Sequence, residues 1–157
     1  MAIYDGSPIQ RGAVSLHTPD VAAVDAALAS ADLAESQWIP WHIRAGTDDA
    51  IVYFSASDAG RLVGQIMLHD IDREQSLALV GYHIFRAADR GRGIGSTALS
   101  MLRDYAFAEE KLQRLIAITG VENAASQRIA EKCGFARKGA AREGAHLVVY
   151  ERLCAAG

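Results

Sequence analysis

The sequence is poor in cysteine, with only Cys133 and Cys154 among its 157 residues. Their spacing matches neither a metal-binding motif nor a disulfide framework, so we expect a reducing, cytoplasmic setting and no metal site. Long apolar runs are also missing, because no stretch approaches the roughly 20 apolar residues of a membrane helix. Residues 1–11 lack the charged start and apolar core of a signal peptide. The sequence therefore predicts no membrane partner.

A strong charge of either sign is absent as well, since the formal net charge is −3. That balance gives no electrostatic reason to expect a nucleic-acid partner. What is present is ordinary globular composition, with half of the residues hydrophobic and 22% charged. The length predicts a single domain over residues 1–157. Residues 1–11 show no clear period, and we expect them to be partly loose.

Apolar periodicity in the first part of the chain predicts a strand over residues 13–17 and a helix that ends near Ser30. Thr18 is the expected helix cap, with Pro19 and Asp20 in the first turn. A short helix is expected over residues 33–38. The large apolar residues of this region form either a lid over the core or a wall of a substrate cleft: Trp38, Ile39, Trp41 and Ile43.

The rest of the chain predicts an antiparallel meander followed by a loop, a helix and a strand. Strands are expected over residues 51–57, 61–69, 77–85, 115–119, 135–140 and 146–153. Helices are expected over residues 93–109 and 124–133, the second capped by Asn123 and ended by Gly134. The strand at 115–119 follows a helix, which favours parallel pairing with 77–85. These elements predict an α+β fold with a mixed, mostly antiparallel sheet of about seven strands and helices on both faces.

A glycine-rich loop, Arg90-Gly91-Arg92-Gly93-Ile94-Gly95-Ser96, separates the strand at 77–85 from the helix that follows. Glycines lack the Cβ atoms that keep a phosphate away from backbone amides. The start of the helix adds unpaired N–H groups and the positive end of a dipole. The two arginines add charge that pairs with phosphate. The loop therefore predicts a diphosphate site.

Two common phosphate-binding patterns do not fit this loop. A dinucleotide fingerprint beginning at Gly91 needs glycine at position 96, which is serine, and a Walker loop needs Gly-Lys-Ser/Thr, which is absent. A flexible turn without a ligand stays open as an alternative, because glycine is common in turns.

The motif Arg90-x-x-Gly93-x-Gly95 resembles the signature of GNAT acetyltransferases, which bind acetyl-coenzyme A. A second motif runs from Asn123 through Ser126 to Gly134-Phe135. Together they are similar to the branch that contains the ribosomal-protein alanine N-acetyltransferases. The close similarity covers residues 77 to about 153, and the two motifs occur at matching spacing.

The resemblance implies which residues hold the coenzyme. In this family the strands on either side of the loop splay apart, and the pantetheine arm lies between them. Backbone groups of Ile84, Phe85 and Arg86 are then expected to pair with that arm. Arg92, Arg128 and Lys132 are candidates for outer phosphate contacts, with ordinary solvated charges as the alternative. The full set of expected coenzyme-binding residues is Ile84, Phe85, Arg86, Arg90, Gly91, Arg92, Gly93, Ile94, Gly95, Ser96, Asn123 and Ser126.

Acetyl transfer requires a neutral amine, donors for the developing oxyanion and a proton for the departing thiolate. Many relatives use a tyrosine as the acid, but Ala130 occupies that position here. The alanine branch instead offers a serine, so Ser126 is predicted to donate a proton or position the sulfur. The alternative is that Ser126 only assists the start of its helix.

The base is less clear, because the branch carries a glutamate at the position of Leu79. His83 is on the same side of its strand as Leu79 and is the predicted base, since histidine titrates near neutrality. A purely structural histidine is the alternative. Weaker candidates are His69, His146, Glu122 and Glu143, and solvent can also take the proton.

The resemblance implies an acetyl-CoA-dependent N-acetyltransferase that works by direct attack in a ternary complex. The acceptor is expected to be a primary amine: a protein N-terminus, an amino acid, or a small metabolite or antibiotic. The last hairpin, around Gly144, is shorter than in the branch, so we expect an open acceptor cleft. Two alternatives remain, a catalytically silent coenzyme A sensor and an enzyme that uses another acyl donor. Homodimers are common in the family.

Overall fold

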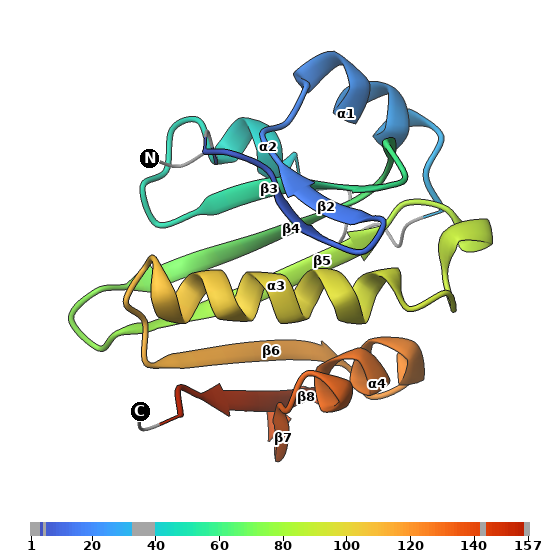
Figure 1. Ribbon diagram of the computed structural model, residues 1–157. Helices are drawn as coiled ribbons and strands as arrows, with labels where there is room; N and C mark the ends of the chain where they lie inside the picture. Colours follow the sequence, from blue (N-terminus) through green and yellow to red (C-terminus); the bar gives the residue numbers. More distant parts are fainter. Residues whose placement is uncertain (1–3, 5, 33–39, 142–143, 156–157) are drawn as a thin grey trace.

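The computed structural model describes residues 4, 6–32, 40–141 and 144–155. Eight strands of this part of the chain form one sheet in the order β1-β2-β3-β4-β5-β6-β8-β7 (Figure 1). The strands are β1 (Ile9–Arg11), β2 (Val14–His17), β3 (Val52–Asp58), β4 (Arg61–Asp72), β5 (Leu77–Ile84), β6 (Arg114–Gly120), β7 (Ala136–Ala141) and β8 (Gly144–Leu153).

Only β5 and β6 pair in parallel, and every other neighbouring pair is antiparallel. The predicted mixed, mostly antiparallel sheet is therefore confirmed, with eight strands where about seven were expected. The extra strand is β1, which pairs with β2 across a tight turn at Gly12, whose φ is +61°. Of residues 1–11, which were expected to be partly loose, Ile9–Arg11 form this strand.

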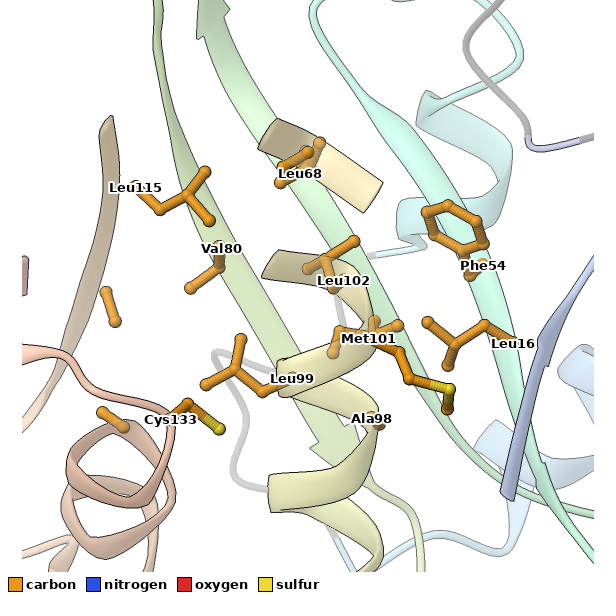
Figure 2. Close-up of a cluster of buried hydrophobic side chains, with 14 of the residues drawn as sticks. Leu16, Phe54, Leu68, Val80, Ala98, Leu99, Met101, Leu102, Leu115 and Cys133 are labelled. Carbon is orange, nitrogen blue, oxygen red and sulfur yellow. The ribbon is translucent and has the colours of Figure 1, made fainter. Parts of the chain in front are cut away.

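Helices cover both faces of the sheet, as predicted. They are α1 (Val21–Ala29), α2 (Trp41–Arg44), α3 (Ile94–Ala108) and α4 (Ala124–Lys132). Strand alternation directs Leu16, Phe54, Leu68 and Val80 onto Leu99 and Leu102 of α3 (Figure 2). Cys133, at the end of α4, joins the same cluster. This α3–α4 face therefore holds the main core.

Two smaller clusters lie on the opposite face, which we call the α1–α2 face. Tyr53 and Met67 pack there with Ala45 and Trp41 beside α2. Val24 and Leu28 of α1 pack with Phe85 at the end of β5. The alternation of β3 from Tyr53 to Phe54 thus buries both sides of the sheet.

The helix boundaries correct one prediction in the first part of the chain. Asp20, not Thr18, caps α1, because its carboxylate accepts a hydrogen bond from Ala23 N at 3.2 Å. The helix expected over residues 33–38 lies outside the described residues, as do Trp38 and Ile39. Asn123 caps α4 as predicted, accepting from Ser126 N at 3.0 Å. Gly134 ends that helix with a φ of +83°.

The parallel pair β5–β6 separates along its length. Leu77–Val80 pairs with Arg114–Ala117, and no pairing is found beyond Val80 in the described chain. Yet β5 continues to Ile84 and β6 to Gly120, so the two strands diverge for several residues. This divergence opens the sheet beside the first residues of α3 and α4.

Candidate active site

A cavity of about 680 Å³ lies at the divergence of β5 and β6. The end of β5, the glycine-rich loop and the first turns of α3 and α4 form its walls. It brings together most of the residues predicted from the sequence: His83, Ile84, Arg90, Gly91, Gly93, Ile94, Gly95, Ser96, Asn123 and Ser126. Arg128 and Lys132 of α4 also line it.

The loop owes its shape to two glycines in the left-handed region. Gly91 has a φ of +75° and Gly93 a φ of +81°, which side chains rarely adopt. Gly93 is the N-cap of α3 and offers no side chain to cap it. The first amides of α3 therefore remain available to a ligand, and the helix dipole favours an anion there.

The backbone at the end of β5 favours the predicted pantetheine contact of Ile84 over those of Phe85 and Arg86. Phe85 N donates to Val63 O of β4 at 2.9 Å, so this amide is already used. Because alternate residues direct their backbone groups to opposite sides of a strand, Ile84 points its N–H toward the divergence. The Phe85 side chain is buried against α1, and Arg86 donates to Ser30 Oγ at 2.9 Å. Neither Phe85 nor Arg86 lines the cavity.

Both loop arginines are engaged by the protein itself. The Arg90 guanidinium donates to Ile84 O at 2.9 Å and to Asp32 O, which ties the loop to the end of β5. Arg92 pairs with Asp58 at 3.1 Å and Asp89 at 3.4 Å, and it does not line the cavity. Their positions favour a structural contribution to the phosphate site over the direct phosphate pairing expected from the sequence.

Asp89 is a site residue that the sequence did not reveal. Its carboxylate is buried and accepts a hydrogen bond at 3.1 Å from Arg61, which lies at the tip of the β3–β4 hairpin. The hydrogen bond from Arg61 lowers the pKa of Asp89. The only sequence signal was an acid next to a basic loop, and the partner is far away in the chain.

Ser126 lies at the start of α4 and forms a reciprocal pair with Tyr82 of β5. Ser126 Oγ donates to Tyr82 Oη at 3.0 Å, and that hydroxyl donates to Ser126 O at 3.0 Å. Burial raises the pKa of Tyr82 to about 12, so its proton is retained at neutral pH. Tyr82 also lines the cavity and was missed at the sequence level. The structure thus brings two hydroxyl groups together at this place, whereas the sequence predicted only that of Ser126.

Two successive hydrogen bonds on the α1–α2 face fix the orientation of His83. Tyr53 Oη donates to Gln65 Oε1 at 2.9 Å, and Gln65 Nε2 lies 3.0 Å from His83 Nδ1. With the amide in this orientation, Nδ1 accepts and Nε2 carries the proton. Burial, with a smaller effect of His69, lowers the pKa of His83 to about 4. Near-neutral titration was expected, but the structure presents a neutral N–H donor.

The fold and this cavity can now be set beside known proteins. Residues 10–136 match the family described as "Acetyltransferase (GNAT) domain". The chain belongs to the GNAT acetyltransferase family. The predicted resemblance is confirmed, and the diverging strands and the glycine loop are the features of the GNAT fold that the sequence implied.

Relatives of the GNAT domain include "Probable N-acetyltransferase YjcK" of Bacillus subtilis (strain 168). The two are 41% identical over 91 residues, which cover 57% of this chain and 49% of YjcK. The chain spans about half the length of the curated relatives it matches.

Solved structures share the same fold at lower identity. RimL, a ribosomal L7/L12 alpha-N-protein acetyltransferase in complex with coenzyme A, has a TM-score of 0.81 and 16% identity over 96% of this chain and all of that one. The ribosomal-protein-S5-alanine acetyltransferase of Vibrio fischeri has a TM-score of 0.74 and 18% identity, covering 94% and 97%. These likenesses extend the agreement over nearly the whole fold.

Ala130, at the position where the sequence was compared with a catalytic tyrosine, is fully buried in the core and supplies no hydroxyl. Within the described residues no helix is long and apolar enough to cross a membrane. The same residues contain no cluster of three or more His, Cys, Asp or Glu side chains that could hold a metal ion.

Proposed function

We propose that this GNAT domain is an acetyl-CoA-dependent N-acetyltransferase that acts on a primary amine by direct attack in a ternary complex. The cavity at the divergence of β5 and β6 carries the proposal. It runs from the uncapped amides of α3, where an anion binds favourably, to the hydroxyl pair of Tyr82 and Ser126.

The residues present fit coenzyme A. The amides of Gly93 to Ser96 would hold the diphosphate, and the free N–H of Ile84 would pair with the pantetheine arm. Arg128 and Lys132 line the same cavity and offer charge to the outer phosphate. Asp89 and Arg90 act indirectly, because they fix the loop.

Acetyl-CoA supplies an activated acyl carbon when bound, and the side chains near it supply polarity and protons. The Ser126 hydroxyl is suited to return a proton to sulfur and to recover it from water, while its hydrogen bond to Tyr82 Oη holds it in place. His83 lines the cavity, and its Nε2 makes no hydrogen bond to any described residue. Its N–H is suited to stabilise an oxygen that gains charge.

The acceptor is proposed only as a class of amine. Proteins of the same fold include, by their descriptions, ribosomal-protein acetyltransferases and a spermidine N-acetyltransferase. A protein N-terminus, an amino acid and a small metabolite or antibiotic therefore all belong in the first screen. A cytoplasmic location and a homodimer stay predictions.

The test is release of free thiol from acetyl-CoA in the presence of a panel of amines. The panel should contain spermidine, free amino acids and peptides with alanine and serine N-termini. Thiol release that depends on one amine, with an acetylated product detected by mass spectrometry, is the expected result. Replacing the donor with propionyl- or succinyl-CoA decides the acyl preference.

A catalytically silent coenzyme A sensor is the second candidate, and Ala130 and Leu79 favour it. Both occupy positions where relatives carry a catalytic side chain. Tight binding of coenzyme A by calorimetry, without thiol release for any amine, would establish the sensor and reject the enzyme.

A further inference from the structure

His69 and Asp70 form a second polar pair near the end of β4, on the strand next to β5; neither residue itself lines the cavity. Asp70 Oδ2 lies 2.6 Å from His69 Nδ1. The pair sits at a β-bulge, because the register of β4 against β5 shifts between His69 and Asp72. Asp70 itself has a φ of +48°, in the left-handed region. Bulges and left-handed residues concentrate beside active sites, where they redirect side chains.

The bond to Asp70 fixes the state of the His69 ring. A carboxylate only accepts, so Nδ1 carries the proton and the lone pair of the neutral ring is on Nε2. His83, two residues beyond Gly81 on the neighbouring strand, has the opposite tautomer because Gln65 donates to its Nδ1. One imidazole therefore presents a donor to the site and the other presents an acceptor.

Gly81 lies between His69 and the cavity. It lines the cavity and pairs with Met67 in the middle of the β4–β5 ladder. A Cβ on Gly81 would stand 3.7 Å from His69 Nε2 and 2.5 Å from Met67 Sδ, so Met67 fills the place that a side chain at position 81 would take. The acceptor nitrogen of His69 therefore lies directly behind Gly81, close to the wall of the cavity.

Trp41 of α2 also packs against the His69 ring. The centroids of Trp41 and His69 are 4.8 Å apart with the rings tilted by 39°, and the Arg44 guanidinium lies 5.0 Å from the Trp41 ring. Contact with Trp41 and the Asp70 bond together hold the imidazole in one orientation. The charged or titratable groups recorded around it are Asp70 on its own strand, His83 on β5 and Arg44 on α2.

We propose that His69, oriented by Asp70, is the general base that takes the proton from the acceptor amine. This role rests on the proposed acetyltransferase function. His69 Nε2 accepts one proton from the ammonium form and passes it to solvent. The neutral amine nitrogen then bonds to the thioester carbonyl carbon as the carbon–sulfur bond breaks. The second amine proton leaves to solvent, and the thiolate takes a proton from water or from Ser126, whose hydroxyl is then reprotonated by water.

The role differs from the base predicted from the sequence. His83 has a pKa too low for an effective base at neutral pH and makes a better donor. His69 needs no glutamate at position 79, because it approaches the same wall from the adjacent strand, where it pairs with Leu79. The departure of Leu79 from the branch is thereby compensated.

Kinetics of His69→Gln, Asp70→Asn and Asp70→Gly test the proposal, with His17→Gln as the matched control. His17 belongs to β2, does not line the cavity, and its ring lies 2.7 Å from Ser57 Oγ. Asn and Gly both tolerate the left-handed backbone of position 70, so these variants remove the carboxylate without adding strain. His69→Gln should lower kcat with the amine about 100-fold or more, while the affinity for coenzyme A stays within about threefold. His17→Gln should match the wild type.

The pH profile separates a base from a binding residue. With His69 in place, kcat should rise as the imidazole loses its proton, and this limb should be absent from His69→Gln. A His69→Ala variant should regain activity with added imidazole. An unchanged kcat and profile in His69→Gln would overturn the base, as would a variant that raises only the KM for the amine.

A measurement on the free protein needs no turnover. Nitrogen-15 spectra of the histidine side chains should show His69 protonated at Nδ1 and His83 at Nε2, with the His69 preference lost in Asp70→Asn. A His69 ring protonated at Nε2 would overturn the proposal even if the enzyme is active. Absence of thiol release by the wild type with every amine would instead reject the acetyltransferase function, and this role with it.

Discussion

At the scale of single residues, the hydroxyl pair of Tyr82 and Ser126 joins the two sides of the cavity. One group comes from β5 and the other from α4, and each donates to the other residue. Ser126 Oγ has a partner whose pKa is raised, so the pair remains fully protonated at neutral pH. Such a pair returns a proton to a leaving sulfur more readily than an isolated serine, since the hydrogen bond is already formed.

Tyr82→Phe and Ser126→Ala should both lower kcat, by about tenfold or more, while changing the KM for acetyl-CoA by less than about threefold. The double variant should lose little more than the worse single one, because the two groups act together. Steady-state kinetics check this, with Tyr150→Phe as the control. Tyr150 is also a buried tyrosine, and its hydroxyl donates to Glu131 of α4. If kcat in all variants equals that of the wild type, Ser126 only contributes to the start of its helix.

Asp89 acts at the residue scale through two arginines on different elements. Its buried carboxylate accepts from Arg61 at the start of β4 and from Arg92 in the loop. Asp89→Asn removes the negative charge that pairs with both guanidinium groups, so the loop loses the ion pairs that hold it in place. We expect the free energy of unfolding to fall by about 1–3 kcal/mol and the Kd for coenzyme A to rise severalfold.

Calorimetric titration and thermal unfolding measure these two effects. The control is Asp104→Asn, which removes a half-exposed carboxylate that pairs with Arg11 away from the loop. Surface pairs of this kind contribute about 0–1 kcal/mol, so the control should unfold near the wild-type temperature. Tighter coenzyme A binding by Asp89→Asn would show that Asp89 repels the phosphates of the ligand and does not stabilise the loop that binds them.

At the scale of elements, the N-terminus of α3 is the structure on which coenzyme A binding depends. Gly93→Ala forces a side chain into a φ of +81°, although no atom lies within 4 Å of the new Cβ. The left-handed conformation costs an alanine about 1–2 kcal/mol, which favours rotation of the amides away from the site. Gly93→Asp adds a negative charge to the same place.

Gly93→Asp should therefore raise the KM for acetyl-CoA more than tenfold and Gly93→Ala by less, with kcat at saturation nearly unchanged in both. Initial rates at varied donor concentration provide the measurement. Gly95→Ala is the comparison within the same helix, because its Cβ would meet the flexible end of Ile129 at 2.8 Å. That contact tests α3–α4 packing without changing the N-cap, so its effect on KM should be smaller. Unchanged cofactor affinity in Gly93→Asp would remove the loop from the site.

At the scale of the whole molecule, local signals in the sequence predicted most of the sheet. The β3–β4 hairpin and the Asn123 cap depend on residues close together in the chain. The parallel pairing of β5 with β6 was predicted because a helix connects the two strands. The glycine loop was recognisable because three glycines and a following helix are contiguous. The cavity residues contributed by that loop follow from the same short segment.

What escaped prediction depends on contacts between distant residues. Tyr82 on β5 reaches Ser126 on α4, 44 residues away, and Asp89 reaches Arg61 on β4, 28 residues away. The state of His83 depends on Gln65 and Tyr53, one and two strands away. No periodicity reports such pairings. The amide of Phe85 was misassigned for the same reason, since its orientation is set by pairing with β4.

The burial of His83 should make the free energy of unfolding depend on pH. Its pKa is about 4 in the folded protein, against 6.5 for an unperturbed histidine. Between these values the unfolded chain binds more protons than the folded one, so the free energy of unfolding falls as the pH is lowered from 6.5 to 4. The loss for this one group amounts to about 3 kcal/mol at most. His83→Gln removes the titrating ring, and its stability should decline less over that window.

Denaturant unfolding of both proteins between pH 4 and 7.5 tests this difference. The wild type should lose stability relative to His83→Gln as the pH falls below 6.5, whichever of them is more stable at neutral pH. Above pH 6.5 the difference should be constant, because the ring is then neutral in both states. Parallel curves across the whole range would mean that His83 titrates as in the unfolded chain, and the neutral N–H donor assigned to the site would then be wrong.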